Sequence, residues 1–182
     1  MGVNWNAGMI RWQPYTSDTG QAYRLFHLHP FRYGLVLSSG TEAEIRVGFA
    51  LHCFTRACDS DDVESQYYSD DRETRTFCPD RYALSFRLPD IARNLATSKC
   101  GFAKDDNFVT INVDSEGGVS RSYGVFFNVL RVKDVDGVAI LLTIQSAYEL
   151  RPGKQVPVRG SIKFTRLVEL TLEGVKPKPA QR

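Results

Sequence analysis

The sequence lacks the features that would assign it to a membrane, to a secretory pathway or to a disulfide scaffold. No apolar run approaches the roughly 20 residues that a membrane-spanning helix needs. The N-terminus has neither the basic segment nor the apolar segment of a secretory signal. Only 4 cysteines are scattered through 182 residues, a length that can fold without disulfide bonds. We therefore expect a cytoplasmic protein that has no membrane partner and whose cysteines are thiols.

Several signatures of well-known enzymes are also missing. The chain has no Gly-x-x-x-x-Gly-Lys-[Ser/Thr] loop, no strand-linked Gly-x-Gly-x-x-Gly, no Gly-x-Ser-x-Gly and no His-Glu-x-x-His. Nucleotide hydrolysis, dinucleotide redox chemistry and standard serine or zinc hydrolysis are therefore disfavoured, and we expect no cofactor. A net charge of +2 is too small to indicate nucleic acid as a partner by bulk electrostatics, so any such partner must meet a local patch.

The chain divides into three parts by composition. Residues 1–21 show neither a helical nor a strand period, and we expect an irregular arm pinned by Trp5 or Trp12. Residues 22–174 have the length and composition of a single domain. Residues 175–182 alternate lysine with proline, which neither packs nor pairs, and this predicts a flexible tail.

Hydrophobic periodicity predicts an α+β fold, a predominantly antiparallel β-sheet meander with one main helix. Pro89 and Asp90 suit the first turn of a helix over 88–97, and a long polar surface loop is expected at 57–75. An extended run at 23–29 should precede a hairpin of 33–38 with 44–54. Strands in series, linked by short turns, are then predicted at 108–113, 123–132, 138–150 and 162–172.

Alternation along the segment from Glu44 to Phe54 places two reactive side chains on opposite faces. The period of two is typical of a half-buried strand, so His52 should face solvent and Cys53 the core. A zinc site is the alternative, but the spacing is unlike that of a zinc knuckle and favours no metal. The potential ligands are His27, His29, His52, Cys53, Cys58, Cys78 and Cys100.

Arginines gather just before the predicted helix, and they suggest an anion site. The guanidinium is a planar fork of donors suited to phosphate oxygens, and unpaired N–H groups at a helix start favour negative charge. The alternative is a structural role, in which these arginines pair with the acidic residues around 59–71 and neutralise a crowded surface. The arginines in question are Arg72, Arg75 and Arg81.

These groups together are those that metal-free RNA cleavage requires, because a 2′-hydroxyl must lose a proton while charge builds on the phosphate. In this hypothesis Arg75 and Arg81 hold the phosphate and His52 moves the proton. Further contacts to the substrate would come from Arg72, His27, His29 and Tyr148. The histidine pair shares one face if 23–29 is a strand. Tyr148 is equally compatible with the end of a buried strand.

Four short segments carry a resemblance to known proteins, namely His52–Thr55, Arg75–Ser85, Leu88–Ile91 and Gln145–Tyr148. In these segments the chain resembles a group of small uncharacterised bacterial proteins from genomic islands and prophage-like regions. The resemblance spans roughly residues 23–172, implies a bacterial, intracellular setting, and transfers no activity. The arrangement of a helix before an antiparallel meander is also similar to small endoribonuclease toxins, a likeness of fold only.

The leading hypothesis is therefore a small bacterial RNA-directed enzyme or toxin-like effector that cleaves RNA without a metal ion. The alternative is a non-catalytic protein-binding module. Such a module would engage a protein partner, or a second copy of the chain, through a sheet edge or through the arginine-rich loop.

Overall fold

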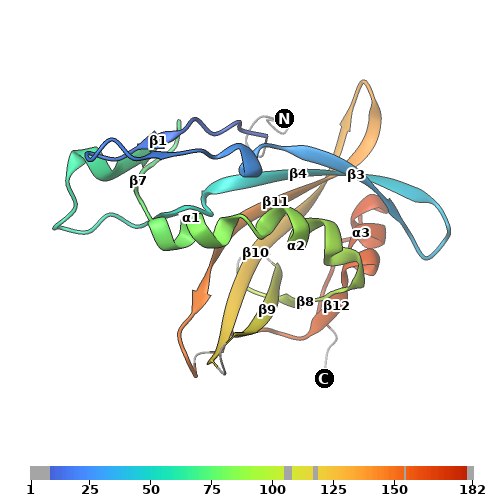
Figure 1. The fold of residues 1–182 in the computed structure, drawn as a ribbon. Helices are drawn as coiled ribbons and strands as arrows, with labels where there is room; N and C mark the ends of the chain where they lie inside the picture. Colours follow the sequence, from blue (N-terminus) through green and yellow to red (C-terminus); the bar gives the residue numbers. More distant parts are fainter. Residues whose placement is uncertain (1–8, 105–107, 117–118, 154, 180–182) are drawn as a thin grey trace.

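The computed structural model describes residues 9–104, 108–116, 119–153 and 155–179, and its fold is α+β, as predicted (Figure 1). The central feature is a curled seven-stranded sheet with the strand order β12-β8-β9-β10-β11-β4-β3. Its strands are β3 (Phe31–Val36), β4 (Glu42–His52), β8 (Lys99–Phe102), β9 (Phe108–Glu116), β10 (Val119–Asp134), β11 (Gly137–Leu150) and β12 (Ser161–Lys163).

Local and distant pairings combine in this sheet. The β9-β10-β11 meander and the β3-β4 hairpin are antiparallel, as expected from the short turns between them. At the β10–β11 turn, Gly137 adopts a φ of 116°, a conformation that favours glycine. β11 and β4, however, run parallel, so the sheet is mixed and not purely antiparallel.

Two small sheets lie beside the large one. β5 (Thr55–Arg56), β7 (Thr74–Phe77) and β6 (Tyr67–Ser69) form one, and β1 (Tyr15–Thr16) with β2 (Ala22–Tyr23) forms the other. The three-stranded sheet, with a 3-10 turn at Glu64–Gln66, occupies the region predicted as a long loop. Within the predicted arm, Trp12 is only 3% exposed and donates its indole N–H to the Phe49 carbonyl at 2.9 Å. Trp5 lies outside the described residues.

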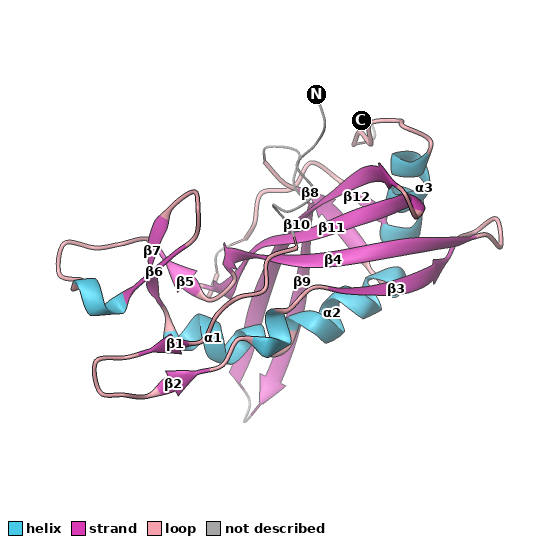
Figure 2. Ribbon diagram, turned by 90° about the horizontal axis from the view of Figure 1, so that it is seen from above, coloured by secondary structure: helices cyan, strands magenta, loops and turns pink. Residues whose placement is uncertain are grey.

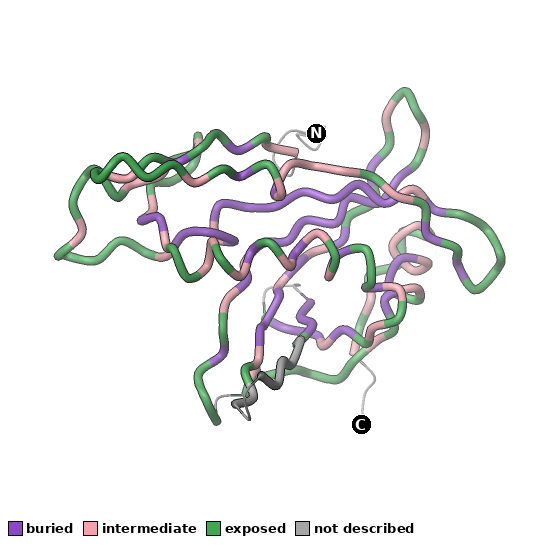
Figure 3. Tube along the Cα trace, viewed as in Figure 1, coloured by how far each residue is buried: buried purple, intermediate pink, exposed green. Residues whose placement is uncertain are grey.

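Helices pack on the large sheet. α1 (Pro79–Ser85) and α2 (Leu88–Asn94) follow one another across one face, and α3 (Phe164–Leu172) packs against β10 and β11 (Figures 1 and 2). Buried residues run through β4, β10 and β11 beneath them (Figure 3). The predicted helix at 88–97 is confirmed, with its last turn, Leu95–Thr97, of 3-10 type.

Two further helices were not predicted, although each carries a signal. α1 begins with Pro79 and Asp80, the same proline–aspartate pair that begins α2. The predicted strand at 162–172 is wrong, because only Ser161–Lys163 is a strand and α3 follows directly. The buried side chains of α3 recur at helical spacing, and they are Phe164, Leu167 and Val168.

The predicted extended run at 23–29 is also wrong. A 3-10 turn occupies Phe26–Leu28, so His27 and His29 do not share a strand face. No helix in the described part of the chain is long and apolar enough to cross a membrane. Residues 175–179 of the predicted tail form no helix or strand, and 180–182 lie outside the described residues.

Candidate functional site

A cleft of about 1700 Å³ opens beside the beginning of α1. It is also lined by the first half of β10 and the end of β11, which lie far from the turn that connects these two strands. Side chains near the β8–β9 connection and along 151–159 complete its walls. Five of the lining residues are basic and two are acidic, so the cleft is electropositive although the whole chain is nearly neutral. They are Arg81, Lys104, Arg121, Arg151 and Arg159, with Asp80 and Glu149.

The cleft exists because β4 is shorter than its neighbour at this end. The last residue of β4, His52, pairs with Ser146 of β11. β11 continues to Leu150, and there it pairs only with β10 among the described residues. The strand end beyond Ser146 therefore forms a wall that no further strand covers.

An aromatic pair stands on this wall. Tyr148 of β11 stacks on Phe126 of β10, with ring centroids 5.3 Å apart and planes 17° apart. Gly124 leaves room beside the pair, because a Cβ there would lie 3.1 Å from Leu150 Cδ2 and 3.3 Å from Phe126 Cε2. Both rings line the cleft and both are half-buried.

Arg81 is the charged group held most firmly in the cleft. Its Nη1 donates to the carbonyl oxygens of His52 at 3.0 Å and Thr55 at 2.8 Å. Its Cζ lies 5.1 Å from the centroid of the Tyr148 ring. Burial lowers the pKa of Arg81 from its ordinary value, and the nearby Arg75 charge adds to this effect. No carboxylate among the described residues pairs with it, so its charge is not neutralised within that part of the chain.

A second network surrounds the His52 side chain. Its Nε2–H donates to Glu73 Oε1 at 2.6 Å, and the imidazole side chain is 37% exposed. Arg75 donates from Nη1 to the other oxygen of Glu73 at 3.4 Å and from Nε to Thr55 Oγ1 at 3.0 Å. Burial alone would raise the pKa of Glu73, but its bonds to His52 and Arg75 outweigh burial and hold that pKa below its usual value. The other imidazole nitrogen, Nδ1, makes no hydrogen bond to a described residue.

The two networks meet at the end of β4. Adjacent strands lie about 4.8 Å apart, so the pairing of Ser146 with His52 places the His52 backbone one strand away from the cleft wall. The side chains of His52 and Arg75 lie next to the cleft and do not themselves line it. Arg81 contacts the His52 backbone directly. The structure thus brings together four of the predicted site residues: His52, Arg75, Arg81 and Tyr148.

A family model described as the YjaZ family matches residues 14–172. The chain belongs to the YjaZ family. It is 30% identical over 142 residues to the protein YjaZ of Escherichia coli (strain K12), a match that covers 74% of each chain. No solved structure matches. The expected likeness to bacterial proteins is therefore confirmed, and the matched range contains the whole cleft and the His52 network.

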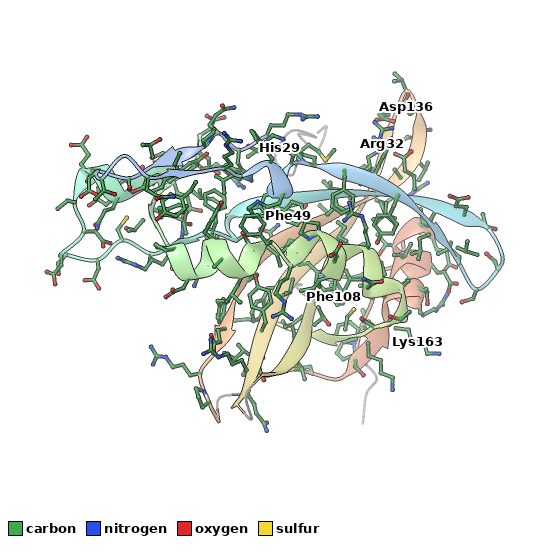
Figure 4. The ribbon with its side chains drawn as sticks, viewed as in Figure 1. His29, Arg32, Phe49, Phe108, Asp136 and Lys163 are labelled. Carbon is green, nitrogen blue, oxygen red and sulfur yellow. The ribbon has the colours of Figure 1, made fainter. Side chains whose placement is uncertain are left out.

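The remaining predicted residues lie elsewhere in this member of the YjaZ family. Arg72 pairs with Asp70 at 3.3 Å, as expected if the arginines pair with the acidic residues around 59–71. His29 Nε2 lies 3.2 Å from the carbonyl oxygen of Trp12, on the upper side of the molecule in Figure 4 and away from the lower ends of β10 and β11. Neither residue lines the cleft.

His27 packs against the end of α1. Its Nε2 is hydrogen bonded to Ser85 Oγ at 2.7 Å, and its ring stacks on Phe86 with centroids 3.8 Å apart. Burial, together with the charge of His29, lowers the pKa of His27 to about 4. A neutral, packed imidazole of this kind has a structural role, and it does not line the cleft.

Sequence reasoning missed the basic rim of the cleft. Arg121, Arg151 and Arg159 lie on separate segments and follow no shared pattern in the sequence. The only local signal is the turn Pro152-Gly153 beside Arg151. No group of three or more histidine, cysteine, aspartate or glutamate side chains that could hold a metal ion is found in the described ranges, and the four cysteines are free.

Proposed function

We propose that this member of the YjaZ family is an RNA-directed enzyme that cleaves RNA without a metal ion. The observation that carries the proposal is Arg81, a partly buried guanidinium that is fixed by two carbonyls and has no carboxylate partner among the described residues. A charge held in this way is stabilised by an anionic ligand, and arginine is suited to phosphate. The cleft that it lines is basic and aromatic.

The chemistry would divide between two groups. Arg81 binds the scissile phosphate and stabilises the charge that builds on its oxygens. His52, whose Nε2–H is held by Glu73, accepts the proton of the 2′-hydroxyl at Nδ1. The 2′-oxygen then bonds to phosphorus, the bond from phosphorus to the 5′-oxygen breaks, and the leaving oxygen takes a proton from the imidazolium or from water.

The test is incubation of the purified chain with a defined RNA, with and without EDTA. We expect EDTA to leave the rate unchanged and His52→Ala to lower it by about 10²–10⁴-fold. Glu73→Gln should lower it less, because the imidazole remains but is held less firmly. His29→Gln is the matched control, because His29 contacts the Trp12 carbonyl and not the Glu73 and Arg81 network, and it should cleave as the wild type does. Intact RNA with the wild type, or complete inhibition by EDTA, would contradict the proposal.

A toxin-like role and a location in a mobile genetic element are finer proposals, and only the first depends on the same site. If the cleavage acts on cellular RNA, expression of the wild type in a bacterial host should arrest growth, and His52→Ala should not. Growth arrest by both chains would show that toxicity does not depend on His52.

The protein-binding alternative has one observation in its favour. β3 is one of the two edge strands of the large sheet (Figure 2), and its Val36 is 66% exposed. An unpaired edge can add a strand from a protein partner or from a second copy. Light scattering on the purified chain tests the second case: a dimer that Val36→Lys dissociates would support it, and a monomer at all concentrations would count against it.

A further inference from the structure

The size of the cleft points to a polymer. Sites for small molecules occupy about 300–1,000 Å³. The cleft is about 1700 Å³, and its basic side chains come from several separate segments. Arg121 lies on β10, Arg151 directly follows β11, and Arg159 lies beside β8 on the segment that joins β11 to β12. A ligand that reaches all three must extend along the cleft.

The aromatic pair gives such a ligand a place to stack. Phe126 and Tyr148 already stack on each other, and the Arg81 guanidinium lies against the Tyr148 ring. A nucleobase that joined Phe126 would extend a stack whose other members are fixed in the free protein, so little side-chain freedom is lost on binding. Stacking of this kind accepts any base, since every base has a flat face.

The rim charges suit the phosphates of a flexible strand. Arg151 and Arg159 are exposed and make no ion pair with a described residue, and Arg121 makes one long contact with Glu149 at 3.8 Å. Their charges are therefore available to a ligand at little cost in broken ion pairs. Each phosphate that they neutralise on a single strand makes the slope of log K against log salt more negative by about 0.7.

A duplex cannot use these features together. Its bases are stacked on each other and paired, so no base face reaches a ring on the wall of a cleft. A single strand can present one unstacked base to Phe126 and its phosphates to the arginines of the rim.

We propose that the substrate is single-stranded RNA, bound with one base stacked on Phe126 and its flanking phosphates on Arg121, Arg151 and Arg159. This inference rests on the proposed function, because it names the form of RNA that the same cleft accepts.

The experiment measures binding separately from cleavage. Fluorescent 10-nucleotide 2′-O-methyl RNA, which lacks the attacking hydroxyl, is titrated with the full chain and followed by anisotropy. The same sequence is supplied as a single strand, as a duplex and as a strand of abasic sugars. Wild type is compared with Phe126→Leu, which keeps apolar bulk but loses the ring face, and with Phe86→Leu as a control that changes an exposed aromatic residue outside the cleft.

The single strand should bind at least about tenfold more tightly than the duplex and the abasic strand, and Phe126→Leu should remove most of that preference for bases. Phe86→Leu should bind as the wild type does. Equal binding of single strand and duplex, or of base-bearing and abasic strands, would overturn this inference and leave cleavage of RNA standing. Absence of binding by every strand would overturn both. The abasic comparison uses the wild type alone and so does not depend on the folding of a variant.

Discussion

Tyr123 of β10 is 2% exposed, and its hydroxyl makes no hydrogen bond within the described structure. Burial raises the pKa of Tyr123, and the nearby Cys53 thiol adds to that effect while Arg87 and Arg81 oppose it. Because the unpaired hydroxyl loses its hydration on folding, Tyr123→Phe should leave the free energy of unfolding unchanged or raise it by about 1 kcal/mol.

Tyr33 is the matched control for this substitution, since its hydroxyl donates to the Ala92 carbonyl at 3.0 Å. Tyr33→Phe should lower the free energy of unfolding by about 1 kcal/mol. Urea denaturation measures both. A loss of more than about 1 kcal/mol in Tyr123→Phe would show that its hydroxyl has a partner.

His27 should make stability depend on pH. Its pKa is lowered from the ordinary value of 6.5 to about 4 in the folded chain. Between these values the unfolded chain binds the extra proton and the folded chain does not, so stability falls as the pH drops from 6.5 to 4. The melting temperature of the wild type should therefore fall more over this window than that of His27→Gln, which cannot take up a proton there. Parallel curves would rule out this role.

At the scale of single residues, some of the predicted site residues lie together in the structure and others do not. His52, Arg75 and Arg81 lie close together because one turn after β4 and the beginning of α1 place them there. Arg72 and His29 are bound to their own neighbours, which no residue type could reveal. The roles of His52, Arg75 and Arg81 in RNA cleavage remain predictions.

At the scale of elements, α3 is the helix that was wrongly predicted as a strand. Leu167 is fully buried, and Leu167→Ala should lower the free energy of unfolding by about 2–5 kcal/mol because it leaves a cavity against β10 and β11. Arg166, its neighbour in the helix, is half exposed and pairs with Glu169 at 3.2 Å. Arg166→Ala should change stability by less than about 1 kcal/mol. Equal effects in urea denaturation would contradict the placement of this helix.

The segment before β12 depends on Gly101 of β8. A Cβ on Gly101 would lie 2.6 Å from Val158 Cγ1, so the Val158 side chain or the segment that carries Arg159 would have to shift. This segment is held by hydrogen bonds of 3.0 Å from Arg159 N to Phe102 O and from Phe102 N to Gly160 O. Gly101→Ala should weaken binding of the single-stranded RNA several-fold, and Val158→Ala in the same chain should recover much of the loss. Unchanged binding by Gly101→Ala would show that this segment does not shape the cleft.

Elements close in sequence were predicted well, and those defined by distant pairing were not. The meander from β9 to β11 and the β3-β4 hairpin follow from alternation and turns. The two small sheets are made of strands of two to four residues, too short to show a period. At 164–172 the helical spacing of Phe164, Leu167 and Val168 was the local signal for a helix, and packing on β10 and β11 accompanies it.

At the scale of the whole molecule, one long-range pairing builds the site. β4 and β11 lie side by side in parallel although the chain between them contains most of the other elements. No local pattern specifies such a pairing, so the prediction of a predominantly antiparallel meander did not include the parallel pair. The same pairing aligns His52 with Ser146 and leaves the end of β11 uncovered, so the basic cleft, too, could not be read from the sequence.

The most direct test of the account is the salt dependence of binding of the single-stranded 2′-O-methyl RNA. Arg151→Ser with Arg159→Ser removes two rim charges, and Arg131→Ser removes an exposed arginine from the other end of β10 as the control. The double variant should bind more weakly, and its slope of log K against log salt should be shallower by about 1.4, or 0.7 for each lost phosphate contact. Arg131→Ser should match the wild type. Equal affinities and slopes in all three chains would contradict binding of RNA in the cleft.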